Sequence, residues 1–468
     1  MVSESRKEQT GDWLAPRAPG PVRAVVRLPG SKSMTNRALV LAALSDRPTV
    51  INGPLVARDT QLMADALSAL GCRIEQTPGS WLVEPAAAVR QRPGSVPASR
   101  PGIDVDVGNA GTVLRFVPPV AALTAADVTF RGDPRASRRP VGPLLIALRT
   151  MGVTISDTGT GAVPFVVRGR GAVPGGTVTM DASSSSQLVS GLLLAAARFG
   201  AGAEIRHAGP LVPSLPHIDM TVRMLQAAGV DVRADAGQRA DGARPADRGP
   251  AADVITSRTW RVLPGPVRPA VIDVEPDLSN AVPFLAAALA TGGEVTVAGW
   301  PARSLQPAAR IIELLTSMGA DVRLTGGGLT VSGSGRIRGV GADLSEVSEL
   351  TPVLTALAAL ASSPSEFTGI GHVRRHESDR IAALAGEIGK LGGDVTELAD
   401  GLRIRPAPLR GVAAFDSHDD HRLVMAAAVL GLVTDGVRVQ NAATVSKTFP
   451  EFSRRWAEIL TPAARSAP

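Results

Sequence analysis

The chain has 468 residues, of which 44% are hydrophobic, and this length and composition predict a globular protein with two or three domains. Its 49 basic and 43 acidic residues leave a formal net charge of +6, aromatic residues make up 3%, and tyrosine is absent. Scarce aromatic side chains and the lack of a long Lys/Arg run argue against a nucleic-acid-binding protein. The small basic excess favours small anionic substrates.

Targeting signals and cysteine content predict where the protein works. The apolar run at residues 423–433 is shorter than the about 20 residues that a membrane helix needs. Residues 1–20 have no apolar core and are not typical of a secretory signal. Cys72 is the only cysteine, which excludes an intrachain disulfide and predicts a cytoplasmic setting, with Cys72 itself a buried, inert thiol.

The first element that the sequence predicts is a strand at residues 22–28, followed by a turn at Pro29-Gly30-Ser31 and a helix rich in Ala and Leu. Helix N-termini favour anions, and Lys32, Ser33 and Arg37 add charge and hydrogen bonds there. We interpret this stretch as a phosphate or carboxylate site. It is not a P-loop, because only Gly30 precedes Lys32. The alternative is an ordinary turn with solvated charges.

This pattern of a helix rich in Ala and Leu, a small-residue turn and a β-branched strand recurs six times. A second helix recurs with a glycine at its end, where a C-cap needs positive φ, as at Gly71 and Gly152. Self-similarity at this spacing predicts a repeated unit of about two helices and three or four strands, arranged as two lobes of three. The first helices begin near residues 36, 112, 186, 279, 349 and 421.

Polar motifs stand at the starts of several of these first helices. Gly108-Asn109-Ala110-Gly111-Thr112 lets backbone N–H groups approach a ligand, although such a turn is common. The loop at residues 132–140 contains Arg135, Arg138 and Arg139, which either clamp an anion or are solvated. Ser183-Ser184-Ser185-Ser186-Gln187 offers donors, although one serine is enough for an N-cap.

The last two repeats carry mixed acids and bases. Glu349 stands at a helix start and is followed by a charged stretch at residues 371–380, and residues 418–422 read His-Asp-Asp-His-Arg. Either histidine pair, His372 with His376 or His418 with His421, has the ligand types of a metal site. The interleaved arginines would repel a cation, so we expect no metal.

Together these motifs resemble the family of 5-enolpyruvylshikimate-3-phosphate synthases (3-phosphoshikimate 1-carboxyvinyltransferases). The resemblance runs from about Pro21 to Trp456. The motifs occur in the family's order: Pro-Gly-Ser-Lys-Ser…Asn-Arg at 29–37, Asn-Ala-Gly-Thr at 109–112, Ser-Ser-Gln at 185–187, His-Glu-Ser-Asp-Arg at 376–380, Asp-His-Arg at 420–422 and Lys-Thr-Phe-Pro-Glu-Phe at 447–452.

The resemblance implies an α/β (α+β) fold, a two-lobed inside-out α/β barrel of six βαβαββ repeats, three per lobe. It implies transfer of the enolpyruvyl group of phosphoenolpyruvate to the 5-hydroxyl of shikimate 3-phosphate, with release of phosphate, in aromatic amino acid biosynthesis. No metal or organic cofactor is implied, and a cytoplasmic monomer inhibited by glyphosate is expected. The expected boundaries are a flexible tail at 1–20, one lobe at 21–29 and 275–460, the other at 30–274 with a flexible loop at about 233–253, and a tail at 461–468.

The resemblance also implies roles for individual residues. Glu349 is the expected proton acceptor, Glu377 assists proton transfer at the reacting carbons, and Lys32 faces both substrates. The residues implied for shikimate 3-phosphate are Lys32, Ser33, Arg37, Ser185, Ser186, Gln187, Ser214, Glu349 and His376. Those implied for phosphoenolpyruvate are Lys32, Gly111, Arg139, Gln187, Arg380, Arg422 and Lys447.

Two positions depart from the family's usual pattern. Many members have Asp where this chain has Glu349, and Lys where it has His376. The first change keeps a carboxylate but alters its reach. The second replaces a permanent cation with a group that can titrate near neutrality, so we predict that His376 binds shikimate 3-phosphate in a pH-dependent way.

Two other functions compete with this prediction. The sister enzyme that transfers enolpyruvate to UDP-N-acetylglucosamine usually carries a cysteine in a mobile loop, but the corresponding loop near residues 135–139 has none. A nucleic-acid-binding repeat protein would show exposed aromatic side chains or a continuous basic stripe rather than cations at helix starts.

Overall fold

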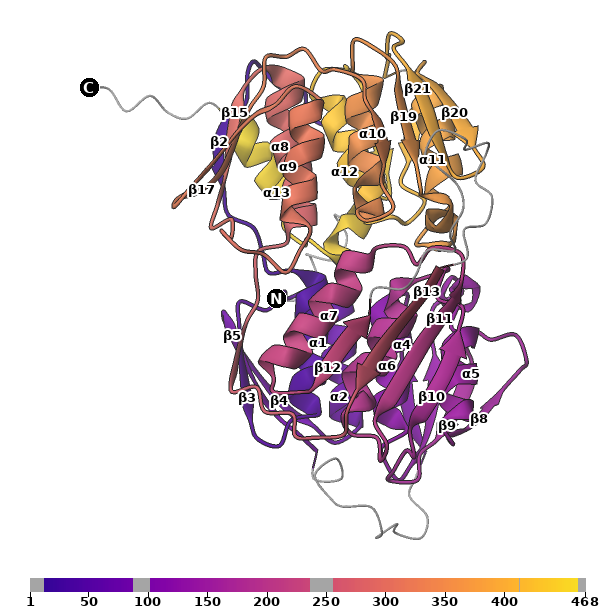
Figure 1. Ribbon diagram of the computed structural model, residues 1–468. Coiled ribbons are helices and arrows are strands. Elements are labelled where there is room, and N and C mark those ends of the chain that lie inside the picture. The colour runs from indigo at the N-terminus through magenta and orange to yellow at the C-terminus, as the bar shows by residue number, and fades with distance from the viewer. Residues whose placement is uncertain (1–11, 87–101, 236–255, 412, 462–468) are drawn as a thin grey trace, which may run out of the picture. The chain divides into compact units, whose positions relative to one another are not determined.

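The computed structural model describes residues 12–86, 102–235, 256–411 and 413–461 (Figure 1). By its contacts the chain divides into a central unit, Gly30–Glu275, and a terminal unit, Met1–Pro29 with Pro276–Pro468. Most of the loop expected at 233–253 and most of the tail expected at 461–468 lie outside the described residues. Of that loop, the residues up to Asp235 belong to a strand.

Three four-stranded sheets make up the outer layer of the central unit, and each joins a parallel pair of strands to an antiparallel pair. One sheet has the order β6 (Ile103–Asp106), β7 (Asp127–Arg131), β9 (Phe165–Arg168), β8 (Thr154–Asp157). The second has the order β10 (Gly176–Met180), β11 (Ala203–Gly209), β13 (Thr256–Val262), β12 (Val232–Asp235). The third has the order β14 (Val271–Asp273), β3 (Thr49–Asn52), β5 (Ser80–Glu84), β4 (Arg73–Thr77).

Helices fill the inside of the central unit. In three of them buried residues occur all around the helix, as expected of segments rich in Ala, Leu and Val. These three are α1 (Lys32–Ala43), α4 (Gly111–Ala121) and α6 (Ser186–Ala196), and α4 packs on both α1 and α6. Three more helices, each packed on one side, are α2 (Arg58–Ala69), α5 (Gly142–Thr150) and α7 (Leu215–Ala227).

The terminal unit repeats this plan. Its sheets have the orders β16 (Asp321–Thr325), β17 (Gly328–Ser332), β15 (Glu294–Ala298), β2 (Arg23–Val26); β18 (Gly341–Asp343), β19 (Ser365–Thr368), β21 (Gly401–Arg405), β20 (Asp394–Leu398); and β1 (Trp13–Leu14), β23 (Arg438–Gln440), β22 (Ala414–Asp416). Its buried helices are α8 (Leu278–Thr291), α10 (Thr351–Ala359) and α12 (His421–Gly431), which pack on one another. Its other helices are α9 (Ala308–Ser317), α11 (Arg380–Lys390) and α13 (Phe452–Leu460).

Five of the six sheets, with their helices, follow the order β-α-β-α-β-β, and this repeat, with helices inside and sheets outside, is the predicted fold class. Two repeats take their first strand from a distant part of the chain. Strand β14 pairs in parallel with β3, and β2 pairs in parallel with β15. Among the described residues the sixth sheet has three strands, β22, β23 and β1. Strand β1 comes from the N-terminal part of the chain and pairs antiparallel with β23. Trp13 and Leu14 are therefore part of a sheet, although the sequence predicted a tail there.

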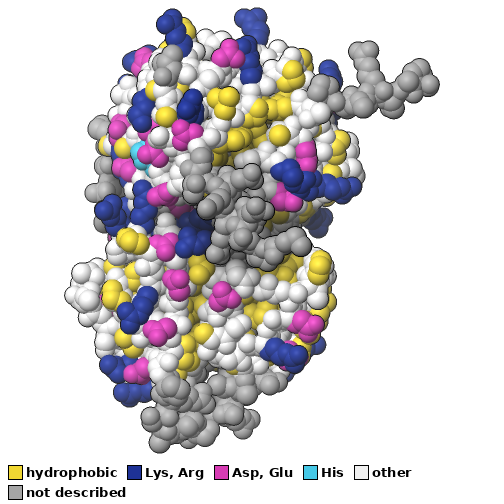
Figure 2. Space-filling model, turned by 180° about the vertical axis from the view of Figure 1, so that it is seen from behind, with side chains coloured by type: hydrophobic (Ala, Val, Ile, Leu, Met, Phe, Trp, Pro, Cys, Tyr) yellow, Lys and Arg dark blue, Asp and Glu magenta, His cyan; other side chains and the backbone are white. Residues whose placement is uncertain are grey.

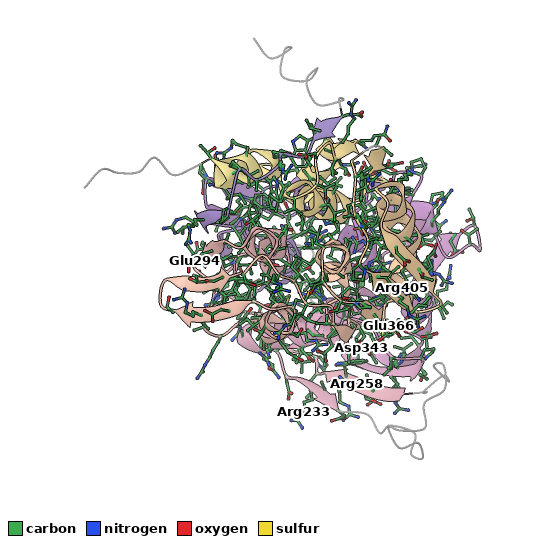
Figure 3. All side chains as sticks on the ribbon, turned by 90° about the horizontal axis from the view of Figure 1, so that it is seen from above. Arg233, Arg258, Glu294, Asp343, Glu366 and Arg405 are labelled. Carbon is green, nitrogen blue, oxygen red and sulfur yellow. The ribbon has the colours of Figure 1, made fainter. Side chains whose placement is uncertain are left out.

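The surface carries charges of both signs. On the face in Figure 2, Lys and Arg side chains lie near Asp and Glu side chains. Several form ion pairs along the outer strands, such as Arg403 with Glu366 at 2.8 Å and Arg323 with Glu294 at 2.8 Å. Figure 3 labels Glu294, Glu366 and Arg405 on these strands. The face in Figure 2 shows no continuous basic stripe, which disfavours a nucleic-acid-binding function. Within the described ranges no helix is long and apolar enough to cross a membrane.

Candidate active site

The turn before α1 places Lys32 in the first turn of a capped helix. The Ser31 hydroxyl accepts a hydrogen bond from the Met34 N–H at 3.5 Å. The Lys32 ammonium donates to a carboxylate oxygen of Asp59 at 3.1 Å, and the two side chains are 19% and 3% exposed. A Cβ on Gly30 would lie 2.1 Å from the Gly53 carbonyl oxygen, so only glycine fits at this turn. Lys32 is therefore a held cation at a helix N-terminus and not a solvated charge.

Arg37 is more deeply buried than the sequence predicted. Its guanidinium donates to the Thr221 hydroxyl at 2.7 Å, the Ser190 hydroxyl at 3.3 Å and the His217 carbonyl at 3.0 Å. It also donates to the Ser33 carbonyl at 3.0 Å, and burial lowers its pKa to about 9. These bonds tie α1 to α6 and α7. The side chain of Arg37 thus joins three helices at an enclosed helix start, and its expected contact with shikimate 3-phosphate stays a prediction.

Gly111 lies against two arginines at the start of α4. A Cβ there would come within 2.6 Å of Arg139 Nη2 and 2.9 Å of Arg115 Nη1. Arg139 is fixed by donation to the Asn109 carbonyl at 2.7 Å, and Arg115 donates to the Gln187 side-chain oxygen at 2.8 Å. Glycine thus leaves room for two guanidinium groups beside the N-terminus of α4. This arrangement suits a small anion.

Only one arginine of the loop at residues 132–140 takes part in this group. Arg139 is buried, whereas Arg138 is exposed and Arg135 is half-buried in or beside a short 3-10 turn, η1 (Ala136–Arg138). Of the loop's three arginines, Arg138 fits the solvated alternative, and the anion-clamp alternative stays a prediction for Arg139.

The serine motif caps α6. Ser185 is its N-cap, and its hydroxyl accepts from the Gln187 N–H at 3.3 Å. Ser214 begins α7 with a left-handed φ of 51°, which is uncommon for serine. Ser185, Ser186 and Ser214 are buried or nearly so. Because α6 and α7 pack side by side, the N-termini of two neighbouring helices carry these serines, and the hydroxyl of Ser185 caps α6.

In the terminal unit, a buried network of charges surrounds the start of α11. The Arg380 guanidinium donates to both oxygens of Asp420, at 2.8 and 3.1 Å, and to Glu377 at 3.1 Å. Lys447 lies 3.5 Å from the other Glu377 oxygen. Burial alone would lower the pKa of Arg380, but the Asp420 and Glu377 carboxylates outweigh it and raise that pKa above its usual value. Glu377 is thus held between two cations.

Glu349 and Arg422 lie in the same unit. Glu349 is half-buried in a 3-10 turn, η2 (Ser348–Leu350), just before α10, and accepts from the Ser279 hydroxyl at 3.3 Å. Arg422, in the first turn of α12, is buried, and burial lowers its pKa, with the Arg380 charge acting in the same direction. The carboxylates of Asp277, Glu349 and Asp420 oppose that shift. Glu349 therefore faces a cation that its own charge stabilises.

Two histidines lie beside Arg380, in and just after a 3-10 turn, η3 (Gly371–Arg375). The rings of His372 and His376 meet edge to face at 5.4 Å, and His376 Nδ1 lies 3.5 Å from Arg380 Nη1. His372 Nε2 lies 2.9 Å from the Ser348 hydroxyl. Burial, and then the charge of Arg380, lower the pKa of His372 to about 4. His372 is therefore neutral at pH 7.

Several residues of these groups were not identified as site residues from the sequence. They are Asp59, which holds Lys32; Arg115, which holds Gln187; His372; and Asp420, which holds Arg380. Asp420 stood inside a motif that the sequence did single out. Cys72 is buried, as predicted, and burial raises its pKa. Among the described residues, no group of three or more His, Cys, Asp or Glu side chains has the arrangement of a metal site.

The fold defines a repeat-built α/β protein in which cations and helix N-termini gather at several helix starts. The model of the EPSP synthase (3-phosphoshikimate 1-carboxyvinyltransferase) family matches residues 16–456. The 3-phosphoshikimate 1-carboxyvinyltransferase of Kocuria rhizophila is 48% identical over 450 residues, 96% of each chain. That of Mycobacterium ulcerans is 49% identical over 454 residues, 96% of this chain and 97% of that protein. The chain belongs to the EPSP synthase family.

Solved structures agree with this assignment. The fold is similar to that of EPSP synthase from Acinetobacter baumannii, with a TM-score of 0.72 and 25% sequence identity, over 96% of this chain and 97% of that one. A second structure of the same enzyme gives a TM-score of 0.71. The resemblance and the fold class inferred from the sequence motifs are thus confirmed.

Proposed function

We propose that the chain transfers the enolpyruvyl group of phosphoenolpyruvate to the 5-hydroxyl of shikimate 3-phosphate and releases phosphate, a step of aromatic amino acid biosynthesis. Family membership and nearly full-length relatives named for this activity support the reaction. In this proposal the two contact units are the two lobes of the enzyme. The roles of individual residues rest on the geometry of each unit.

In the central unit, the proposed role is binding. Ser185, Ser186 and Ser214 hold the phosphate of shikimate 3-phosphate with hydroxyl groups and helix N-termini. Lys32 neutralises substrate charge from the start of α1, with Ser33 beside it. Arg37 supports these groups by fixing α6 and α7 against α1.

The cradle at Gly111 is the proposed contact for phosphoenolpyruvate in the same unit. Arg139 supplies charge there, and Gln187 is held in place by Arg115. In the terminal unit Arg380, Arg422 and Lys447 are the further cations for the phosphate and carboxylate of phosphoenolpyruvate. A planar guanidinium matches such groups in a bidentate manner.

Proton transfer is the proposed task of the acids in the terminal unit. The substrate's 5-hydroxyl oxygen bonds to C2 of phosphoenolpyruvate, its proton passes to Glu349, and C3 gains a proton to become a methyl group. The resulting tetrahedral intermediate then loses phosphate as the C2–O bond breaks, and the methyl group returns one proton. Glu377, held between Arg380 and Lys447, is the carboxylate proposed to exchange that proton.

The observation that carries this proposal is the buried Arg380–Glu377–Lys447 group, which combines anion-binding cations with a carboxylate able to accept or donate a proton. The test is a phosphate-release assay with phosphoenolpyruvate and either shikimate 3-phosphate or UDP-N-acetylglucosamine. We expect phosphate release when shikimate 3-phosphate is the acceptor and none when UDP-N-acetylglucosamine is the acceptor. Release with the sugar nucleotide alone would assign the chain to the sister activity.

The setting of the enzyme is also a proposal. We infer a cytoplasmic monomer that needs no added cofactor, on the basis of the single buried cysteine and the small substrates. Sedimentation equilibrium at enzyme concentrations used in assays tests the monomer, and a twofold mass would contradict it.

A further inference from the structure

His207 is a buried polar side chain for which the reaction proposed above has no use. It lies near the end of β11 and is 1% exposed. Its Nδ1 accepts a hydrogen bond from the Ala182 N–H at 3.2 Å, and its Nε2 lies 2.8 Å from the Pro210 carbonyl oxygen. An amide only donates and a carbonyl only accepts, so the ring is neutral with its proton on Nε2.

The two backbone groups that His207 holds belong to the two loops that end at the serines. Ala182 follows β10, and its carbonyl accepts from the Ser185 N–H at 3.1 Å, at the N-cap of α6. Pro210 follows β11 and begins the short loop to Ser214, the N-cap of α7. One imidazole therefore links the backbones that set the positions of both helix starts.

Packing alone does not explain a histidine here. The residue two positions earlier, Ile205, is fully buried and pairs across the sheet with Trp260, so an apolar side chain is the ordinary choice on this face. A buried polar ring costs free energy unless both nitrogens are hydrogen-bonded. Both are bonded at His207, and both bonds reach backbone atoms that no apolar side chain could hold.

We propose that His207 is a positioning residue for shikimate 3-phosphate, which fixes the loops of Ser185, Ser186 and Ser214 in the arrangement that receives the substrate's phosphate. This inference rests on the proposed function and deepens it. His207 does not touch the substrate. It acts by holding the Ala182 N–H and the Pro210 carbonyl at the separation that one imidazole spans.

Charged side chains lie around His207. Arg258 on β13 is its cross-strand partner (Figure 3), and Asp219 on α7 interacts with Arg258. Asp181 lies against Gly209, where a Cβ would come within 2.7 Å of its carboxylate. Nδ1 must carry no proton in order to accept the hydrogen bond from the Ala182 N–H.

The test compares His207→Phe with a matched control, Ile205→Val. Phenylalanine keeps a planar ring but removes both hydrogen bonds, whereas Ile205→Val trims the same face of the same strand without touching either loop. The dissociation constant of shikimate 3-phosphate, measured by calorimetry without phosphoenolpyruvate, should rise about tenfold in His207→Phe, as expected for lost hydrogen bonds at an anion site. The KM for phosphoenolpyruvate should change less than about twofold, and the control should match the wild type in both.

Each outcome decides one proposal. If wild type fails to bind shikimate 3-phosphate, the proposed function fails. If wild type binds it and folded His207→Phe binds it equally well, the positioning role fails. If the dissociation constant of shikimate 3-phosphate and the KM for phosphoenolpyruvate rise by the same factor, His207 is only a general structural residue and the inference is overturned.

A measurement on the wild type keeps the inference testable if His207→Phe does not fold. Spectra of ¹⁵N-labelled imidazoles should show a neutral Nε2–H histidine whose ring shifts move on addition of shikimate 3-phosphate and not of phosphoenolpyruvate. The absence of any such ring would contradict the proposal.

Discussion

The two units differ in how their candidate site residues handle charge. In the central unit, many of the predicted ligands are neutral donors at helix starts. The cations among them contact mostly neutral groups, as Arg139 does at the Asn109 carbonyl and Arg37 at two hydroxyl groups, although Lys32 pairs with Asp59. In the terminal unit, acids and bases meet directly in a buried network of Arg380, Glu377 and Asp420, with Lys447 at its edge. The first arrangement suits binding of anions, and the second also suits movement of protons.

The difference follows from how charge behaves when it is buried. Neutral hydroxyl and amide donors can stay buried and hydrogen-bonded before the substrate arrives, at little cost. Buried ions need partners of opposite charge, and a carboxylate held between two cations can change its protonation as the substrate's charge changes. Substitutions in the central unit should therefore raise KM values, whereas those in the terminal unit should lower kcat.

Glu377→Gln gives the largest expected effect. It keeps the size of the side chain but removes the proton-exchanging carboxylate, so kcat should fall about 10²- to 10⁴-fold with a smaller change in either KM. Steady-state phosphate release measures this. Glu366→Gln, on an exposed strand pair with Arg403, is the control and should keep wild-type kcat. A raised KM with an unchanged kcat in Glu377→Gln would make Glu377 a binding group only.

Asp420→Asn should damage stability as well as rate. It leaves the buried Arg380 without its closest carboxylate, and breaking such a pair costs about 3–5 kcal/mol. Urea unfolding at pH 7 measures the loss. Asp394 forms an exposed ion pair with Arg405 at 3.6 Å, so Asp394→Asn should lower the unfolding free energy by about 0–1 kcal/mol. Equal losses in the two variants would show that Asp420 does not anchor the network.

Gly111→Ala should act on one substrate only. The added methyl pushes against Arg139 and Arg115, so the KM for phosphoenolpyruvate should rise about tenfold, a loss of about 1.4 kcal/mol, while that for shikimate 3-phosphate stays near wild type. Glyphosate, the phosphoenolpyruvate-site inhibitor of the family, should weaken more than the substrate does. Gly386→Ala, where a Cβ meets nothing within 4 Å, is the control. Equal or tighter glyphosate inhibition in Gly111→Ala would count against this assignment.

His372 should make the fold sensitive to acid. Its pKa is lowered from 6.5 to about 4 by burial first and the Arg380 charge second, so the unfolded chain binds the proton more readily. The stability that the neutral ring contributes is complete above pH 6.5 and is lost as the pH falls toward 4. When the pH falls from 7 to 4.5, the unfolding free energy of wild type should drop by roughly 1–3 kcal/mol more than that of His372→Gln. Parallel curves for the two proteins would refute this.

His376 gives the smallest expected effect, a few-fold change in the KM for shikimate 3-phosphate. A histidine that loses charge above neutrality binds a phosphate less well, so this KM should rise between pH 6 and 8.5 in wild type. His376→Lys keeps its charge and should show a flatter profile. A KM that stays constant over this range in both proteins would sink the hypothesis.

The sequence predicts the repeats and helix starts well because both depend on local patterns. Ala- and Leu-rich segments such as residues 186–196 form helices wherever they pack, and Ser31 and Ser185 cap the helices that follow them. The resemblance placed residues 21–29 in one lobe with residues 275–460. The pairing of β2 with β15 and of β14 with β3 was not predicted, because a strand's sequence does not specify its partner.

The parts of the site that the sequence missed are partnerships. Asp59, Asp420 and His207 matter because of atoms on other elements, and only the fold brings these together. The depth at which Arg37 is buried was not predicted, because a charged residue near a helix start usually faces solvent. Burial of α1 on all sides turns it inward instead.

The central claim is that the 5-hydroxyl of shikimate 3-phosphate adds to phosphoenolpyruvate and that phosphate is then eliminated, with protons exchanged in the terminal unit. Turnover in D₂O tests this claim most directly. During turnover C3 gains a deuteron and then returns one of three hydrogens, so the methylene group of the product should carry deuterium by NMR or mass spectrometry. We predict such incorporation in wild type and in Ser186→Ala at saturating shikimate 3-phosphate. In Glu377→Gln the rate of deuterium incorporation should fall. A wild-type product whose methylene group holds no deuterium would contradict the account.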